Sequence, residues 1–434
     1  MDRSFAQLAG CLERLSRHDA WAGLIAAAAL IFGLSTPAFA QWQPNETRAS
    51  AQTDLIDFEF SQSRGMFVWN DCCGKLWIGN VDRATGRFVP SDGKFMLIDP
   101  DSMTYQDAQK TKNGPEWVST SIGDVIVYTR YSGYHTDGNS RIGYAYPLQG
   151  SSSCNYVSAD AYWCAYDLGP ALPRKAPYGS HTPGDPAPRI SYVDNREVHY
   201  WRELWNPASE RTIPDFPPSN YQVRLTECAA PGVAGVRSVV YPVDVGGIDQ
   251  VFMRDFDSGV VTQLTSDGGQ KYEVWMWCAP EFGNELVFFT LVDQVELRVY
   301  RNLPVGPGGA LQWTPIYSQF APPGNQIYSP EPFVYEGKSY IFMSQTVQPN
   351  KFRSQVWIAN IDAAAPLFKR ITPLTPLQTR TDPEMFITDN GPYIYYNVLE
   401  NSTRPNGQPK TCRDPVTCSL GVWFADPGLK ASAP

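Results

Sequence analysis

The sequence of 434 residues has little charge and very little histidine. Only 18% of the residues are charged, and three of the four histidines, His135, His181 and His199, follow residue 40. It has no G-x-S-x-G motif, no H-E-x-x-H motif and no glycine-rich phosphate loop, which sets aside serine hydrolases, zincins and nucleotide-binding proteins. A net charge of −9 without a Lys/Arg cluster argues against nucleic acid or an anionic membrane as a partner. A neutral or cationic ligand is expected instead.

Long apolar runs are also absent after residue 40. Before it, an apolar run from Trp21 to Leu34 is followed by Ala38-Phe39-Ala40, the small-residue pattern that a signal peptidase cleaves. This run is shorter than the roughly 18 apolar residues that a spanning helix needs. We therefore predict that residues 1–40 are a signal peptide and that residues 41–434 form a periplasmic or secreted protein without a membrane span.

The cysteines support export. One of the nine, Cys11, lies in the predicted signal peptide, and the even number that remains suggests disulfides formed in an oxidising compartment. No cysteine spacing pairs with histidines as a zinc site requires. The expected pairs are Cys154 with Cys164, Cys228 with Cys278, Cys412 with Cys418, and the neighbours Cys72 and Cys73 with each other.

What the sequence has in abundance is aromatic residues, at 13%, with 37 Pro and 34 Gly, a composition typical of many short strands and turns. Four segments share Pro-Glu, a short turn and an aromatic-rich strand, with prolines at 115, 280, 330 and 383. Weaker copies without the glutamate start at Ala187 and Ala230, and a proline-free copy starts at Leu55. A repeat of about 50 residues built from strands alone is the pattern of a propeller blade.

The second half of the repeat, as in IDQVFMRDFDSGVVTQLT from Ile248, resembles the repeats of TolB-type and WD-like exported propellers. TDPEMFITDNGPYIYYNV from Thr381 is similar, more weakly, to blades of arabinanase-like glycosidases. We predict an all-β chain, residues 41–434 forming one β-propeller of seven blades, or six if the first and last units merge. A strand before Leu55 is expected to close the ring, and insertions are expected at about 149–187 and 401–419.

In a propeller the first strand of each blade lines the central channel, so equivalent residues converge there. The pattern predicts a ring at one channel mouth made by Glu116, Glu281, Glu331 and Glu384, with a possible contribution from Asp57 or Glu59. Mutual repulsion is expected to raise the pKa of some of these carboxyl groups. A pair of them could hydrolyse a glycosidic bond, and three or more could hold Ca²⁺. Alternatively, each glutamate accepts backbone N–H groups and joins neighbouring blades.

The glycosidase resemblance implies an Asp base, a second Asp that tunes it and a Glu acid. Asp382 and Glu331 fit the local patterns, although they occur late in the chain and in reverse order. The candidate catalytic residues are Glu281, Glu331, Asp382 and Glu384. A glycoside hydrolase is one predicted activity, and the alternative is a non-catalytic TolB-like propeller that binds or scaffolds an envelope or extracellular protein partner.

A polysaccharide lyase is a further possibility, in which His135 beside Tyr134, or His199 beside Tyr200, would move the proton. Arg130, Arg141 and Arg202 would then neutralise the uronate. The candidates for ligand binding are Glu116, Trp117, His135, His199, Tyr162 and Trp163, with Tyr156 and Tyr178 as further stacking candidates. A disulfide between Cys72 and Cys73 would form a rigid turn that could contact a sugar or only stiffen the hairpin.

Overall fold

The computed structural model describes residues 45–430, and residues Pro44–Pro434 form one compact unit. The segments that are not described lie at 112, 149–153, 170–172, 183, 215–222, 227, 229–236, 307–308, 348–352, 376, 407–408 and 411–414. The predicted signal peptide and Cys412 therefore lie outside the described residues. No helix in the described part of the chain is long and apolar enough to cross a membrane.

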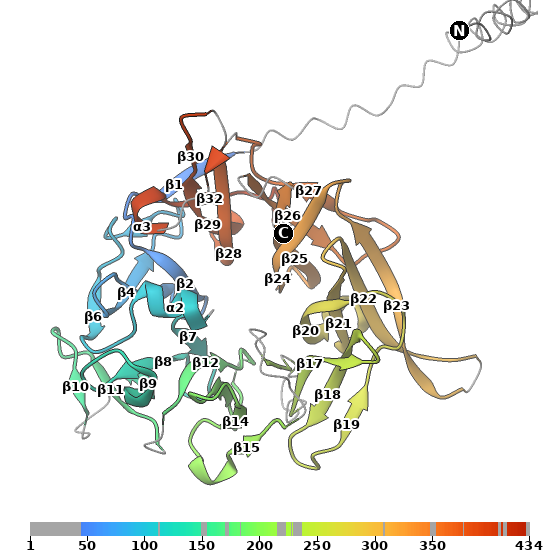
Figure 1. Cartoon of the computed structure of the whole chain (residues 1–434), viewed down its shortest axis with the longest axis horizontal. Helices are drawn as coiled ribbons and strands as arrows, with labels where there is room; N and C mark the ends of the chain where they lie inside the picture. The colour runs from blue at the N-terminus through green and yellow to red at the C-terminus, as the bar shows by residue number, and fades with distance from the viewer. Residues whose placement is uncertain are drawn as a thin grey trace, which may run out of the picture. The chain divides into compact units, whose positions relative to one another are not determined.

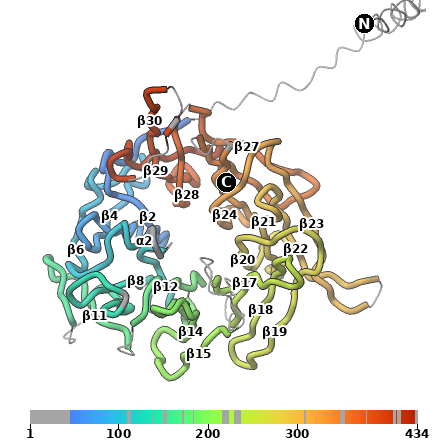
Figure 2. The backbone as a smooth tube through the Cα atoms, in the orientation of Figure 1, coloured from blue at the N-terminus to red at the C-terminus, as the bar shows by residue number. Residues whose placement is uncertain are grey.

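The described residues form seven antiparallel sheets of four or five strands, arranged around a central axis (Figures 1 and 2). The predicted seven-bladed β-propeller is confirmed, and the six-bladed alternative is wrong. Blades 1 to 7 are numbered by the order of their innermost strands. These are β2 (Ile56–Ser61), β7 (Glu116–Val118), β12 (Lys175–Gly179), β16 (Arg224–Leu225), β20 (Lys271–Ala279), β24 (Asn325–Tyr335) and β28 (Gln378–Thr388).

The outer strands follow in chain order in blades 3 to 6. The second strands are β3 (Met66–Asn70), β8 (Val125–Tyr131), β13 (Arg189–Val193), β17 (Ser238–Val245), β21 (Glu285–Val292), β25 (Lys338–Val347) and β29 (Gly391–Glu400). The third strands are β4 (Leu76–Val81), β9 (Ser140–Pro147), β14 (His199–Glu203), β18 (Ile248–Asp255), β22 (Glu296–Pro304), β26 (Ser354–Asn360) and β32 (Ser419–Ala425). The outermost strands are β5 (Phe88–Val89), β6 (Met96–Asp99), β10 (Tyr156–Val157), β11 (Trp163–Asp167), β15 (Arg211–Thr212), β19 (Val261–Gln263), β23 (Leu311–Phe320), β27 (Phe368–Arg370) and β1 (Glu46–Ser50).

Short helices and one small hairpin connect these strands. The hairpin joins β30 (Ser402–Thr403) and β31 (Pro409–Lys410) within the predicted insertion at 401–419. The helices are α2 (Tyr105–Thr111), α3 (Pro415–Cys418) and the 3-10 turns η1 (Asp137–Asn139), η2 (Pro207–Ser209) and η3 (Pro280–Phe282).

The ring is closed by the N-terminal strand, as predicted. β1 is the outermost strand of blade 7 and pairs antiparallel with β32, with Glu46 opposite Ala425. Inside the blade, the guanidinium of Arg380 lies 2.6 Å from the carboxylate of Glu46 and is fully buried. The hydroxyl of Tyr396 donates to the same carboxylate at 2.9 Å. This ion pair joins the outermost strand of blade 7 to its innermost strand through a buried guanidinium group.

The hydrophobic core lies between blades, which explains why blades repeat. A single blade cannot bury both of its faces, whereas neighbouring blades bury them against each other. One cluster joins blades 7 and 1, where Phe60 of β2 packs 4.8 Å from Tyr395 of β29, measured between ring centres. The aromatic residues Tyr396, Phe288 and Phe289 of the second strands are fully buried.

A β-bulge recurs in the innermost strands and sets the direction of the side chains that follow it. In five blades the pairing register shifts at a non-glycine residue with positive φ. Such a residue costs about 1–3 kcal/mol of backbone strain and is most common near functional sites. These residues are Asp57 (58°), Ala176 (52°), Glu273 (44°), Ser329 (45°) and Asp382 (54°).

In three of the predicted units, the proline precedes the second strand of a blade and not the innermost strand. The segments from Ala187 and Ala230 contain β13 and β17, which are second strands, and the prolines before them therefore do not begin the innermost strands. Pro280 follows the innermost strand β20 and begins η3. The predicted insertion at 149–187 also supplies regular strands, namely β10, β11 and β12, because its serine- and proline-rich turns interrupt true blade strands.

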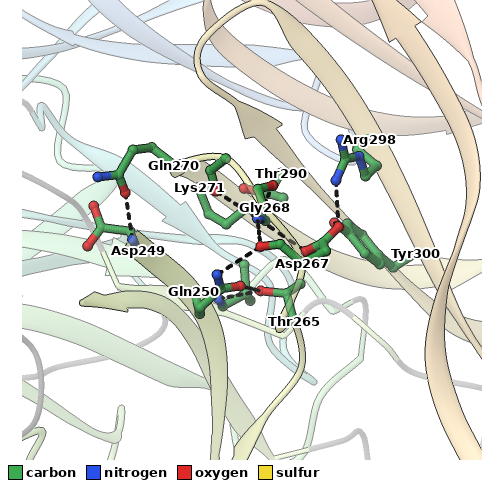
Figure 3. Close-up of polar contacts among 12 residues, drawn as sticks. Asp249, Gln250, Thr265, Asp267, Gly268, Gln270, Lys271, Thr290, Arg298 and Tyr300 are labelled. Carbon is green, nitrogen blue, oxygen red and sulfur yellow. Dashed lines mark hydrogen bonds and ion pairs between the residues drawn. The ribbon is translucent and has the colours of Figure 1, made fainter. Parts of the chain in front are cut away.

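The start of β20 is fixed by a buried ammonium group (Figure 3). Lys271 donates to the carbonyl oxygens of Asp267, Gly268 and Gly269 at 3.0, 3.1 and 2.8 Å, and its side chain is fully buried. The carboxylate of Asp267 also accepts hydrogen bonds from Arg298 and from the hydroxyl of Tyr300. Lys271 lies two residues before the bulge at Glu273. The network therefore fixes the loop that precedes the central part of β20.

Two predicted disulfides are present, Cys154–Cys164 and Cys228–Cys278. Cys418 is also disulfide-bonded, and its predicted partner Cys412 lies outside the described residues. The prediction for the adjacent pair is wrong in this structure, because Cys72 and Cys73 are exposed free thiols with sulfur atoms 2.9 Å apart.

Candidate functional site

A cavity of about 620 Å³ lies on the axis of the propeller and is lined by all seven innermost strands. Each blade contributes one side chain at an equivalent position, which is opposite the central part of the second strand. In blades 1, 3, 5, 6 and 7 this position comes two residues after the bulge. From blade 1 to blade 7 the residues are Glu59, Glu116, Tyr178, Arg224, Trp275, Glu331 and Glu384.

These seven side chains divide the cavity wall into two parts. Blades 3, 4 and 5 contribute a cation between two aromatic rings, with the guanidinium carbon of Arg224 4.4 Å from the ring centre of Tyr178 and 4.0 Å from that of Trp275. Such contacts stabilise a partly desolvated cation by about 1–2 kcal/mol. A nitrogen of Arg224 also lies 4.0 Å from the carboxylate of Glu331.

The other part, from blades 6, 7, 1 and 2, consists of four glutamates, and we name it the acidic arc: Glu331, Glu384, Glu59 and Glu116. The bulge residues Asp57, Glu273 and Asp382 add three more carboxyl groups to the cavity wall. Seven acids therefore face one arginine, since Arg224 is the one Lys or Arg among the described residues that line this cavity. The described residues that line the cavity therefore carry an excess of potential negative charge.

Several of these carboxyl groups have no donor to satisfy them. Within the described part of the chain, the side chains of Asp57, Glu59, Asp382 and Glu384 form no hydrogen bond and no ion pair, although Glu384 is only 7% exposed. Buried polar groups in proteins are nearly always hydrogen-bonded, because an unsatisfied one costs about 1–3 kcal/mol. The alternative interpretation, in which glutamates join blades through backbone N–H groups, therefore does not describe Glu59 or Glu384.

Burial and mutual repulsion raise the pKa of the carboxyl groups in the cavity. Burial is the main cause for Glu384 and Glu59, whose pKa values lie well above the ordinary range, and repulsion from other acids of the arc adds to it. The pKa of Asp57 is raised by burial and then by repulsion from Asp382. For Asp382 burial raises the pKa to about 6, although the positive charge of Arg224 acts in the opposite direction. Burial and repulsion therefore favour the neutral form of these carboxyl groups.

His181 lines the cavity beside Glu116, and Gly114 packs against Asp57. The imidazole Nε2 of His181 lies 3.9 Å from a carboxylate oxygen of Glu116. A Cβ atom on Gly114 would lie 2.5 Å from a carboxylate oxygen of Asp57, which is far closer than van der Waals contact allows. Residue 114 must therefore be glycine for the Asp57 side chain to keep its place against blade 2.

Of the four glutamates predicted to form the ring, Glu116, Glu331 and Glu384 lie together in the cavity, and Asp382 lies with them. The placement of Glu281 is wrong. It lies on η3, beyond the end of β20, where its carboxylate accepts hydrogen bonds from the backbone N–H and the hydroxyl of Ser339 at 2.8 and 2.9 Å. It lines a separate cavity of about 390 Å³ together with Phe282 and Arg301. The corresponding cavity residues of blade 5 are Glu273 and Trp275.

Tyr178, a predicted stacking residue, lines the axial cavity, whereas the other residues predicted to bind a ligand lie outside it. Trp117 and Trp163 are buried against each other between strands of blades 1 and 2, and Tyr162 is 66% exposed on a surface turn. His135 is stacked on Tyr131 and lies 3.0 Å from Asp107. His199 is a buried residue of β14. The histidine that lines the cavity is His181.

The calcium site predicted at the ring has no geometric support. No group of three or more His, Cys, Asp or Glu side chains among the described residues is arranged so that it could hold a metal ion. The acids of the arc line one cavity without forming such a set.

The sequence contains a signal for the residues that were missed. In Ala176-Pro177-Tyr178, Ser329-Pro330-Glu331 and Asp382-Pro383-Glu384, a proline separates the bulge residue from the cavity residue. Aligning KAPYG with SPEPF and DPEMF would have placed Tyr178 in the ring. Arg224 and Trp275 have no proline before them, so only the pairing of β16 and β20 with their neighbours reveals them.

Comparisons with known proteins identify the fold and no closer relationship. No family model matches the chain, and no curated protein matches its sequence. The β-propeller domain of Cps50 (Swd1) from Myceliophteria thermophila is 9% identical and covers 82% of this chain and 96% of its own, with a TM-score of 0.50. TolB from Acinetobacter baumannii is 13% identical and covers 83% of this chain and 78% of its own, with a TM-score of 0.37. The likeness to the Cps50 propeller agrees with the predicted propeller fold and shows the fold alone.

Proposed function

We propose that this protein is an exported binding propeller whose axial cavity takes a small ligand that donates hydrogen bonds to carboxyl groups. The observation that carries the proposal is the set of cavity acids, Glu384 foremost, that are buried without a donor among the described residues. A ligand with several O–H or N–H groups would satisfy them. Two disulfides support an oxidising compartment for the protein, either the periplasm or the extracellular space.

Sugars are one ligand class that fits, since each carries many hydroxyl donors. A second candidate function, hydrolysis of a glycosidic bond, is favoured by one further observation. Asp382 has a pKa raised to about 6, whereas burial holds the pKa of Glu384 and Glu59 well above their ordinary range. A carboxyl group with a raised pKa near a second carboxyl group is a candidate for the general acid that glycoside hydrolysis requires. A polysaccharide lyase would have to use His181, because this is the histidine that lines the cavity.

Calorimetric titration with neutral sugars, sugar acids and small amines tests the binding function. We expect one ligand per chain, and a loss of about tenfold or more in affinity for Glu59→Gln and Glu384→Gln, because each carboxylate accepts strong hydrogen bonds. The matched control is Glu336→Gln, which removes an equal charge at an exposed turn. Binding to all variants with equal affinity would place the ligand elsewhere and contradict the proposal.

Turnover separates the second candidate from simple binding. Incubation with a panel of oligosaccharides should release reducing ends if the protein is a hydrolase, and Glu384→Gln and Asp382→Asn should abolish this release. Binding of a sugar without any turnover would leave the protein as a binding propeller. Capture of a protein partner that does not depend on Glu59 or Glu384 would favour the scaffolding alternative instead.

A further inference from the structure

We infer that the ligand of the axial cavity carries a positive charge, as an alkylammonium group that lies against the acidic arc. This inference rests on the proposed binding function and adds the chemical class of the ligand. Its basis is the balance of charge in the cavity, the internal cation that the protein already places there, and the buried groups that remain unsatisfied.

The charge balance favours a cation over a neutral polyol. Four carboxyl groups of the cavity, those of Asp57, Glu59, Asp382 and Glu384, form no ion pair with a described residue, and Arg224 and His181 are the described lining residues that can be positive. A hydroxyl group donates a hydrogen bond but brings no charge, so it leaves the repulsion among the carboxylates unchanged. An ammonium group donates three hydrogen bonds and also reduces that repulsion. The raised pKa of Glu59, to which burial and then Glu116 and Glu331 contribute, reflects the same excess of negative charge.

Arg224 shows that this cavity stabilises a cation. Its guanidinium lies between Tyr178 and Trp275 and faces Glu331 at 4.0 Å. It occupies the wall made by blades 3, 4 and 5. The wall made by blades 7 and 1 presents Glu384 and Glu59, which form no ion pair with a described residue. The protein therefore places its own cation on one side of the cavity and leaves Glu384 and Glu59 for another.

One buried group points to a missing partner independently of the charge balance. Glu384 is only 7% exposed, lines the cavity and has no hydrogen-bond donor in the described part of the chain. An ammonium group in the cavity would supply that donor.

The size of the cavity indicates an organic cation. A volume of about 620 Å³ holds a molecule of several carbon atoms. A free di- or polyamine and the lysine side chain of a peptide share the required chemistry, and the test distinguishes these two sources.

The experiment compares pentane-1,5-diamine, the isosteric neutral pentane-1,5-diol and the peptide Gly-Lys-Gly in calorimetric titrations at about pH 7.5. We expect the diamine or the lysine peptide to bind, the diol not to bind, and Glu59→Gln/Glu384→Gln to weaken amine binding by about tenfold or more. Glu336→Gln should bind as the unmodified protein does. Binding by the diamine alone identifies a free amine, and tighter binding by the peptide identifies a lysine side chain.

Thermal unfolding of each variant, measured in parallel, shows that a loss of binding is not a loss of fold. If the diol or neutral sugars bind in a Glu59- and Glu384-dependent manner and the amines do not, the inference of a charged ligand is overturned while the proposed binding function stands. Calcium chloride that binds with that dependence, in place of the amines, also overturns it. If no sugar, amine or peptide binds to the folded protein, both the inference and the proposed function are wrong.

Discussion

The guanidinium carbon of Arg224 lies 4.0 Å from the ring centre of Trp275, and this contact fixes the one arginine among the described residues of the axial cavity. The two residues come from the innermost strands of neighbouring blades, β16 and β20. Neither strand resembles the other in sequence, so their relationship exists only in the folded ring. Arg224 is thereby held opposite the acidic arc, where its charge offsets part of the repulsion among the carboxyl groups.

Replacing Arg224 by methionine should destabilise the protein more at about pH 8 than at about pH 5. At the higher pH more of the cavity acids are ionised, and they lose their counter-charge, which we expect to cost about 2 kcal/mol or more of unfolding free energy. At the lower pH protonation reduces the need for that charge. Urea denaturation at both pH values measures the difference. Arg224→Lys keeps the charge and serves as the control, and an equal loss at both pH values would assign Arg224 a packing role only.

Asp382→Asn should stabilise the protein in the absence of ligand at neutral and alkaline pH. Since the folded pKa is about 6, above the ordinary value of 3.8, the stabilising contribution of this group is complete below about pH 3.8 and is lost as the pH rises through 6. The variant lacks this loss. Its free energy of unfolding should therefore exceed that of the unmodified protein by on the order of 1–3 kcal/mol at about pH 8, and by little near pH 4. Denaturation curves across this pH range measure the effect.

The control for Asp382→Asn is Asp82→Asn, for which the expected change in stability at neutral pH has the opposite sign. The hydroxyl of Thr85 and the N–H of Ala84 donate to the Asp82 carboxylate and lower its pKa. This group therefore contributes stability at neutral pH that is lost on acidification, and its replacement should destabilise at neutral pH. If both variants responded to pH in the same direction, the raised pKa of Asp382 would be contradicted.

Gly114→Ala should disturb the cavity more than the fold. The added Cβ would lie 2.5 Å from the Asp57 carboxylate, so either that side chain or the backbone of blade 2 must move, at a cost of about 1–3 kcal/mol. We also expect weaker binding of any axial ligand, because Asp57 lines the cavity. Gly138→Ala is the matched control, since nothing lies within 4 Å of an added Cβ there. Thermal unfolding and ligand titration of the two variants give the comparison, and equal behaviour would contradict the predicted clash.

Arg380→Met should weaken the closure of the ring. The change leaves the carboxylate of Glu46 without its buried partner, for which about 3–5 kcal/mol of stability is expected to be lost. Hydrogen exchange should show β1 and β32 opening before the other strands. Arg196→Met, which removes an ion pair to Asp194 from a side chain that is 73% exposed, should change stability little. A small effect of Arg380→Met would mean that backbone pairing of β1 with β32 alone closes the ring.

Much of the fold follows from the sequence because it depends on local patterns. The repeat of about 50 residues, the aromatic strands and the glycine and proline turns predict a propeller and its blade number, since each blade needs the same strands and turns. The closing strand was also predictable, because the last unit lacks an outer strand. The strand to which each proline belongs was not predictable from the sequence. A proline lies either beside the bulge of the innermost strand, as in β24, or at a turn beyond the end of that strand, as at Pro280.

For the candidate site, the sequence by itself determined that glutamates from several blades would meet on an axis, because equivalent positions of a repeat converge in a ring. Glu116, Glu331 and Glu384 were found in this way. Only the tertiary structure decided that Glu281 is excluded and that Arg224, Tyr178 and Trp275 form the opposite wall. The reason is physical: strand register and the recurring bulges set which side chains face the axis, and register is fixed by pairing and packing between segments far apart in the chain.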